Sequence, residues 1–367
     1  MTPLHALAAL GQSVWIDHLS REVVQGGGLA RMVQRDAVAG VTSNPTIFEQ
    51  AMAAGDAYDP QVRELLDAGV REASQIFWAL ARRDVQEACD VLVPVWEHSK
   101  GRDGWVSLEV DPGLAYDAAR TFEEAVRLRA RVDRPNVMIK IPATEPGLIA
   151  FEDAIAAGIS VNVTLIFSLA RYVDVAERYL RGIERLFEAG GHPGAVASVA
   201  SFFISRIDTE ADRRLDTVGG PTQLRGRLGI ANAKLAYQQF KATFDGPRWR
   251  ALAAQDAAPQ RLLWASTSTK DPAYPDTCYV DELIGPDTVN TMPMATLCAY
   301  REGGRPEARL ESGLQDAWAL VDQLARAGVD YEDVTATLEH DGVTRFVESF
   351  QNLLGGIEAR ISATVSA

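Results

Sequence analysis

Short apolar segments alternate with longer stretches of helical periodicity over most of the chain. The apolar segments are four to eight residues long, which is the usual length of a buried β-strand. Eight of them are expected to be strands: Val14–Asp17, Ala39–Ser43, Trp105–Val110, Val137–Ile141, Ile159–Leu165, Ala197–Ile204, Arg261–Ser266 and Thr288–Met292.

Nearly all of these segments are separated by stretches in which apolar residues recur at helical spacing. Ile76, Leu80 and Val85, for example, alternate with the polar face that carries Asp84, as in an amphipathic helix. Helices are expected at Ala73–Ala88, Gly113–Arg129, Pro146–Ala157, Leu169–Glu188, Thr209–Leu215 and Pro221–Phe244. Strand–helix alternation predicts a parallel α/β sheet, and eight repeats favour a closed (β/α)8 barrel of the TIM type over an open sheet.

The alternation stops at Gly303–Pro306, and two further helices are expected after it. Apolar residues in the last helix form one stripe, namely Val343, Phe346, Phe350, Leu353, Ile357 and Ile361. A helix with a single apolar stripe buries that stripe against a neighbour. Residues 1–300 are therefore expected to form a barrel, and residues 301–367 a C-terminal helical extension packed on it.

Composition restricts the class of protein further. The chain has 367 residues, of which 47% are hydrophobic and 23% charged, so disordered, collagen-like and coiled-coil proteins are excluded. The net charge of −14 makes nucleic acid a poor partner, because its phosphates would be repelled. No apolar run approaches the roughly 18 residues of a membrane span, so no membrane partner is expected.

Cysteines and histidines give no sign of a metal or redox centre. Cys89, Cys278 and Cys298 are scattered, which fits a reducing cytoplasm better than a disulfide framework. The five histidines are dispersed, and no dinucleotide or P-loop glycine motif is present. No cofactor is expected, and the predicted location is cytoplasmic.

Polar side chains occur toward the carboxyl ends of several predicted strands, where the chemistry of a barrel gathers. Period-two alternation places Asn162 and Thr164 on one face of their strand, and Glu109 on a shared face with Asp111. The first strand ends in Asp17. A packed core has no need of these polar residues, so they are candidates for a site.

Lys140 is the central candidate residue. It is one of five lysines in the chain and lies inside the apolar strand segment Val137–Pro142. Apolar neighbours withhold hydration from an ammonium group and lower its pKa, and a neutral amine attacks carbonyls to form a Schiff base. The alternative is a lysine that reaches the surface or pairs with a distant carboxylate.

Two carboxylates are candidate proton carriers beside this lysine. Carbon–carbon cleavage next to an imine needs one group to take a hydroxyl proton and another to manage water at the nitrogen. Glu109 and Asp17 are suited to divide these tasks. Alternatively, Glu109 forms an ion pair with an interior lysine, and Asp17 caps the helix that follows it.

Neutral hydrogen-bonding residues and two cations complete the candidate site. Asn44, Asn162, Thr164 and Ser201 are suited to a polyol, although each could instead satisfy a turn or the backbone. Arg206 and Lys270 follow the sixth and seventh strands, near where barrels often bind phosphate. Ion pairs of these two cations with Asp208 and Asp271 are the alternative.

The segments that carry these residues resemble the transaldolase family, the class I Schiff-base aldolase-type transferases, in its longer bacterial form. The matching stretches are Val14–Asp17, Gly40–Thr46, Val106–Asp111, Ile139–Thr144, Ile159–Ser168, Ala200–Arg206 and Asn290–Pro293. The resemblance implies a (β/α)8 barrel without a cofactor. It also implies transfer of a dihydroxyacetone unit from sedoheptulose 7-phosphate to glyceraldehyde 3-phosphate, in the pentose phosphate pathway.

Roles for individual residues also follow from the resemblance. Lys140 would form the Schiff base, Asp17 would move the C4-hydroxyl proton, and Glu109 would act through a water held by Thr164. The retained three-carbon unit would be bound by Asn44, Asn162 and Ser201. The phosphate would be bound by Arg206 and Ser266. The sequence departs from the family pattern where many members have a base, because that position is Ser268 here and the base is Lys270.

Three alternatives to this function stay open at the level of sequence. The chain could be a related aldolase, a specialised paralogue that acts on another sugar phosphate, or a non-catalytic sugar-phosphate sensor. A homodimer is suggested by the resemblance alone.

Overall fold

Eight parallel strands close into one barrel in the computed structural model, which describes residues 2–366. The strands pair in chain order, and β1 also pairs with β8 to complete the ring. Their bounds are β1 Gln12–Asp17, β2 Val38–Thr42, β3 Trp105–Glu109, β4 Val137–Pro142, β5 Val161–Ile166, β6 Ser198–Phe203, β7 Arg261–Ala265 and β8 Thr288–Met292. The predicted (β/α)8 architecture and its eight strands are confirmed.

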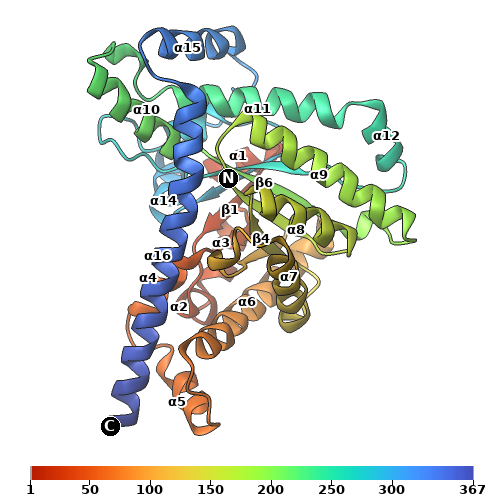
Figure 1. Ribbon diagram of the computed structural model, residues 1–367, viewed down its shortest axis with the longest axis vertical. Coiled ribbons are helices and arrows are strands. Elements are labelled where there is room, and N and C mark those ends of the chain that lie inside the picture. The colour runs from red at the N-terminus through yellow and green to blue at the C-terminus, as the bar shows by residue number, and fades with distance from the viewer. Residues whose placement is uncertain (1, 367) are drawn as a thin grey trace.

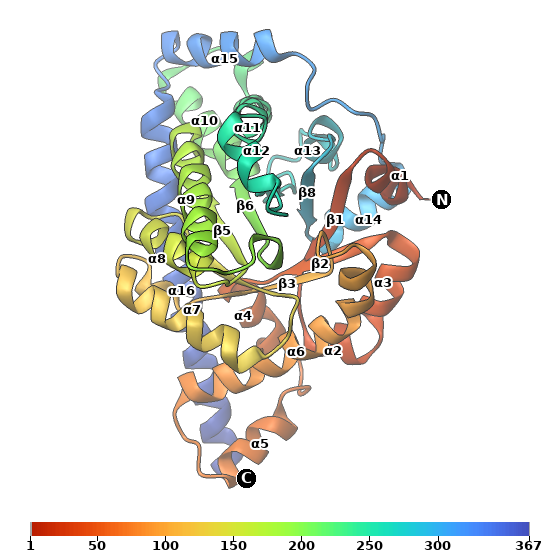
Figure 2. The same cartoon turned by 90° about the vertical axis from the view of Figure 1, so that its right-hand side faces the viewer.

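Helices surround this barrel (Figure 1 and Figure 2). Those before β5 are α1 Pro3–Ala9, α2 Arg21–Gln25, α3 Gly28–Asp36, α4 Pro45–Ala53, α5 Asp59–Asp67, α6 Ala73–His98, α7 Ala118–Val132 and α8 Glu145–Ala156. Those after β5 are α9 Leu169–Glu188, α10 Ser205–Val218, α11 Leu228–Phe244, α12 Pro247–Ala253, α13 Cys278–Glu282, α14 Met294–Gly303, α15 Leu314–Arg326 and α16 Tyr331–Ser366. Short 3₁₀ turns occur at Pro112–Leu114, Pro193–Ala195 and Thr222–Leu224.

Several helix boundaries differ from the sequence prediction, as in α10, which spans Ser205–Val218 rather than Thr209–Leu215. Three of the differences have identifiable reasons. Helix α6 continues to His98 rather than ending at Ala88, because further apolar residues such as Leu92 are buried. Helix α7 begins at Ala118, where the Asp117 carboxylate accepts a hydrogen bond from the Arg120 backbone N–H at 3.0 Å. Helix α11 begins only at Leu228, because Gly226 takes a left-handed conformation with φ of +65°.

Apolar side chains fill the barrel interior below the carboxyl ends of the strands. Met138, Val199, Leu263 and Val289 form a buried cluster with Trp15. Alternate residues of the same strands point outward and form a second core under the helices, as the pleat requires. The middle of the barrel is thus filled by side chains, and one cavity opens at the carboxyl ends of the strands.

The last helix, α16, is 36 residues long and runs along one side of the molecule from α10 to α5 (Figure 1). It packs against α4, α6, α10 and the end of β5. Five residues of its predicted apolar stripe are buried, from Val343 to Ile357, and Ile361 is half-buried. Among residues 2–366, no helix combines the length and the apolar character that crossing a bilayer requires.

Candidate active site

A cavity of about 300 Å³ lies at the carboxyl ends of the strands. Most of the residues proposed from sequence line it: Asp17, Asn44, Lys140, Thr164, Ser201, Arg206, Ser266 and Lys270. They come from six of the eight strand ends or the loops that follow them. Strand register explains part of this convergence, because Lys140 pairs with Glu109 of β3 on one side and Asn162 of β5 on the other.

Lys140 is buried at the floor of this cavity, with 4% of its surface exposed. Its Nζ lies 3.0 Å from Glu109 Oε2 and donates a hydrogen bond to the Ser43 carbonyl oxygen at 3.1 Å. The surface-exposed alternative for this lysine is therefore wrong. Its carboxylate partner is the same Glu109 that sequence reasoning assigned to proton transfer.

The two carboxylates occupy different environments. Burial raises the pKa of Glu109, and the neighbouring Lys140 ammonium opposes that rise. Burial also raises the pKa of Asp17, against the opposing effects of Lys140 and of a hydrogen bond from Thr42. The Thr42 hydroxyl donates that bond to Asp17 Oδ1 at 2.6 Å. One carboxyl is thus paired with the amine, while the other lines the cavity.

Asn162 and Glu109 do not line the cavity directly. Asn162 is fully buried; its amide donates to Ser107 Oγ at 3.0 Å, and its Oδ1 accepts from Ser201 Oγ at 2.6 Å. Ser201 does line the cavity. Asn162 therefore orients Ser201 from the layer below, and Glu109 reaches the cavity through Lys140.

Asn44 and Thr164 both keep hydrogen-bonding capacity at the cavity wall. Asn44 caps α4, with its Oδ1 accepting from the Ile47 backbone N–H at 3.0 Å, so its side-chain N–H groups stay available. The Thr164 hydroxyl is buried and has no hydrogen-bond partner among residues 2–366. Both groups are placed to bind a polar ligand or a water molecule.

Besides Lys140, two basic side chains line the cavity, Arg206 and Lys270. The Lys270 Nζ donates to Ser268 Oγ at 2.8 Å. Lys270 is an exposed residue, but desolvation of its ammonium group lowers its pKa, and the nearby Arg206 lowers it further. Since a second cation acts against the charged amine, an anion bound between these residues would be favoured.

The acidic residues named as alternative partners for these cations are engaged elsewhere. Asp208 accepts hydrogen bonds from the Gly229 backbone N–H at 2.7 Å and from Tyr279 at 2.8 Å. Asp271 lies 3.5 Å from Arg225. Both cations are therefore left to face the cavity rather than these acids.

Sequence reasoning missed several residues that line the same cavity. Thr42, Thr291 and Ser268 are not among the predicted site residues, and the apolar stripe predicts only burial for Phe346. Thr42 lies two residues before Asn44, so period-two alternation places both on the same side of the chain. This spacing could have identified Thr42 as a site residue. Nothing local distinguishes Phe346 from the other members of its stripe.

Asp111 lies outside the cavity, although alternation put it on the same face as Glu109. Strand β3 ends at Glu109, and the Asp111 carboxylate accepts a hydrogen bond from the Gly113 backbone N–H at 2.8 Å. It lines a separate groove of about 780 Å³ beside α6 and α7. That groove contains none of the predicted site residues.

Comparison with known proteins identifies the family. The family model described as "Transaldolase/Fructose-6-phosphate aldolase" matches residues 14–357. A transaldolase of Frankia alni is 51% identical over 362 residues, covering 98% of this chain and 97% of its own. A transaldolase of Acidothermus cellulolyticus is 50% identical over 357 residues, covering 97% and 96%.

The barrel and the buried lysine–carboxylate group are what an aldolase-type enzyme requires if it acts through a Schiff base. Family similarity extends over nearly the whole length of the chain and includes every strand that contributes to the cavity. The chain belongs to the transaldolase/fructose-6-phosphate aldolase family.

Proposed function

We propose that this cavity carries out the transaldolase reaction, with Lys140 as the Schiff-base residue. A dihydroxyacetone unit passes from sedoheptulose 7-phosphate to glyceraldehyde 3-phosphate, giving erythrose 4-phosphate and fructose 6-phosphate in the pentose phosphate pathway. The observation that carries the proposal is the Lys140 amine, buried at the cavity floor and 3.0 Å from Glu109. Relatives about 50% identical over the whole chain support transfer rather than another reaction of this class.

Lys140 begins the reaction by attacking the ketose carbonyl at C2. The proton released from the amine has an acceptor in Glu109, whose Oε2 is 3.0 Å away. Glu109 then returns this proton to the carbinolamine hydroxyl, which leaves as water, and the protonated imine remains. The free Thr164 hydroxyl beside Lys140 is suited to hold the water that enters or leaves.

Asp17 acts in the next step, the cleavage of the C3–C4 bond. It takes the proton of the C4 hydroxyl, the bond electrons move into the imine, and the shortened aldose leaves. A three-carbon enamine remains on Lys140, and the acceptor aldehyde reverses these movements. The Thr42 hydrogen bond keeps the Asp17 carboxylate directed along the cavity wall.

Substrate recognition divides between neutral and cationic residues. Asn44 and Ser201 bind the hydroxyl groups of the retained unit, with Asn162 orienting Ser201. Arg206, Ser266 and Lys270 bind the phosphate. Lys270 supplies the base that the family resemblance leads one to expect at position 268, since its Nζ reaches back to Ser268 at 2.8 Å.

Borohydride trapping tests this assignment. Incubation with fructose 6-phosphate and borohydride is expected to leave a reduced three-carbon adduct on the Lys140 peptide, detectable by mass analysis. Lys140→Ala should abolish the adduct and transfer activity. Lys234→Ala is the matched control, because Lys234 is also buried but pairs with Glu282 away from the cavity. An adduct on another lysine, or turnover retained by Lys140→Ala, would contradict the proposal.

A cytoplasmic location and a homodimeric state complete the proposal. The location rests on the scattered cysteines, which suit a reducing compartment. The homodimer rests on the family resemblance, and light scattering of the purified protein measures it.

A further inference from the structure

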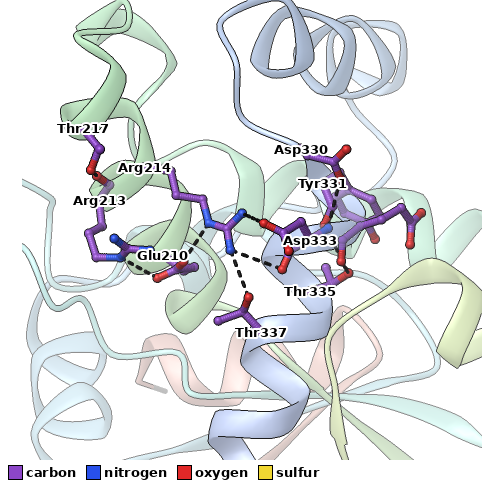
Figure 3. Close-up of polar contacts among 10 residues, drawn as sticks. Glu210, Arg213, Arg214, Thr217, Asp330, Tyr331, Asp333, Thr335 and Thr337 are labelled. Atoms are coloured by element: carbon purple, nitrogen blue, oxygen red, sulfur yellow. Dashed lines mark hydrogen bonds and ion pairs between the residues drawn. The ribbon is translucent and has the colours of Figure 1, made fainter.

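Side-chain contacts hold helix α16 against the rest of the protein near both of its ends. Near its start, Arg214 of α10 pairs with Glu210 at 2.7 Å, contacts Asp333 and donates to Thr337 Oγ1 at 3.0 Å (Figure 3). Tyr331 lies beside this group in the same view, and its hydroxyl donates to Asn232 at 2.7 Å. These contacts set where the helix begins relative to α10 and α11.

The far end of α16 is held by Arg360. Its guanidinium pairs with Asp59 at 2.6 Å and donates to the Met52 carbonyl oxygen at 2.7 Å. Between the two ends, Ser349 shares a hydrogen bond of 2.8 Å with Thr46 of α4. The helix is therefore fixed along its length, so the side chains it presents to the cavity have defined positions.

Gly342 allows α16 to approach the barrel closely beside the site. A Cβ at this position would lie 3.0 Å from Leu165 Cδ2 and within 3.5 Å of Phe167. One turn later, the Phe346 side chain enters the cavity and is only 3% exposed. Its ring centroid lies 5.5 Å from Lys140 Nζ and 6.0 Å from Arg206 Cζ. Phe346 is thus an apolar surface that lies beside both the amine and the phosphate-binding guanidinium.

We propose that Phe346 is a specificity-determining residue that excludes water from the Lys140 adduct and so favours transfer over hydrolytic release. The inference rests on the proposed function and extends it to the choice between two outcomes. After cleavage, the enamine must persist until an acceptor aldehyde arrives. If the enamine is protonated on carbon first, water can add to C2 of the iminium; the C–N bond then breaks, releasing dihydroxyacetone and the free amine.

The position of Phe346 affects these two outcomes unequally. Transfer needs the acceptor aldehyde, which enters as a whole molecule and is held by the phosphate-binding residues. Hydrolysis needs only a water molecule next to C2. A buried phenyl ring offers that water no hydrogen bond and fills the volume it would occupy. Removing the ring opens space beside Lys140 without removing Asp17, Glu109 or either cation.

The test compares Phe346→Ala and Phe346→Leu with Leu353→Ala. Leu353 belongs to the same apolar stripe and is buried, but it does not line the cavity. Free dihydroxyacetone and transferred product are measured with fructose 6-phosphate, with and without erythrose 4-phosphate as acceptor. We expect Phe346→Ala to raise the ratio of release to transfer at least 10-fold, Phe346→Leu to raise it less, and Leu353→Ala to leave it unchanged.

Two outcomes overturn the inference: an unchanged ratio in a folded Phe346 variant, or an equal rise in Leu353→Ala, which would indicate general loosening of α16. If Phe346→Ala does not fold, as judged by its thermal melting, the Phe346→Leu ratio decides. Borohydride trapping separates this inference from the proposed function. Absence of a Lys140 adduct in the unmodified protein defeats the function, whereas a normal adduct with an unmoved ratio defeats only the role of Phe346.

Discussion

At the scale of single residues, the chemistry depends on charges that are buried close together. Lys140 and Glu109 are both about 95% buried and lie 3.0 Å apart. Asp17 is half-buried at the end of β1, and desolvation of its carboxylate raises its pKa. A buried charge without a partner is costly. The opposite charges of this group therefore stabilise one another in the buried site. The same burial prepares the two carboxyls to accept protons.

Asp17→Asn is expected to separate imine formation from bond cleavage. The variant should lose at least about 100-fold in kcat, because the C4-hydroxyl proton has no acceptor. The borohydride-trapped adduct on Lys140 should persist, since forming the imine does not use Asp17. In the unmodified enzyme, kcat/KM should fall as pH decreases through the raised pKa of Asp17, because only the ionised carboxyl is a base. Loss of the adduct together with activity would contradict this division of roles.

At the scale of elements, the loop between β7 and α13 owes its position to α10. Asp212 of α10 accepts a hydrogen bond from Tyr274 at 2.6 Å and another from the Gly226 backbone N–H at 3.0 Å. Tyr274 is four residues after Lys270, so this contact also helps to place the phosphate-binding cation. Gly226 has room for no side chain, because a Cβ would lie 2.5 Å from the Tyr274 ring.

Gly226→Ala and Gly219→Ala form a matched pair that tests this placement. Both glycines have positive φ, +65° and +64°, but a Cβ at Gly219 would meet nothing within 4 Å. Each substitution should cost about 1 kcal/mol of unfolding free energy from backbone strain. Gly226→Ala should cost a further 1–3 kcal/mol or so from overpacking and raise KM for phosphorylated substrates. Urea denaturation measures the unfolding free energy, and steady-state kinetics measure KM. Equal values for the two variants would contradict the proposed role of Tyr274 in placing the loop.

At the scale of the whole molecule, one buried carboxyl outside the catalytic group links stability to pH. Asp208 is 1% exposed and joins α10 to α11 and α13 through the Gly229 N–H and the Tyr279 hydroxyl. Burial raises its pKa to about 7, although these two hydrogen bonds oppose the rise. The folded protein therefore binds a proton at this group more tightly than the unfolded chain does.

Asp208→Asn should change how stability depends on pH. Between about pH 4 and pH 7 the unfolded chain releases the Asp208 proton and the folded protein retains it, so rising pH favours unfolding. The free energy of unfolding of the unmodified protein should therefore fall relative to Asp208→Asn across this range, by roughly 3–5 kcal/mol in total. Denaturant titrations at several pH values measure the difference. Parallel curves, or a slope of the opposite sign, would contradict the raised pKa.

Much of this protein could be predicted from local sequence patterns. Eight apolar segments separated by amphipathic ones identified the barrel, because the periods of strands and helices are set by backbone geometry within a few residues. Lys140 could be identified from local sequence too. A lysine within a continuous apolar strand is expected to be buried, and a buried lysine needs a polar partner or a function. The early end predicted for α6 was wrong because local periodicity does not reveal which neighbour covers the next turn.

What the chain determined alone was the set of strands, their order and the polar residues at their carboxyl ends. Only the tertiary structure decided which of those residues meet: the 3.0 Å contact of Lys140 with Glu109, the burial of Asn162 beneath Ser201, and the separation of Asp111 from the site. Phe346 shows the difference most clearly. Its apolar stripe predicts burial, but not against which part of the barrel. The ring lies beside Lys140, some 200 residues earlier in the sequence, only because α16 packs across the end of the barrel. Periodicity is a property of neighbouring residues, whereas contact between distant ones depends on the closure of the whole barrel.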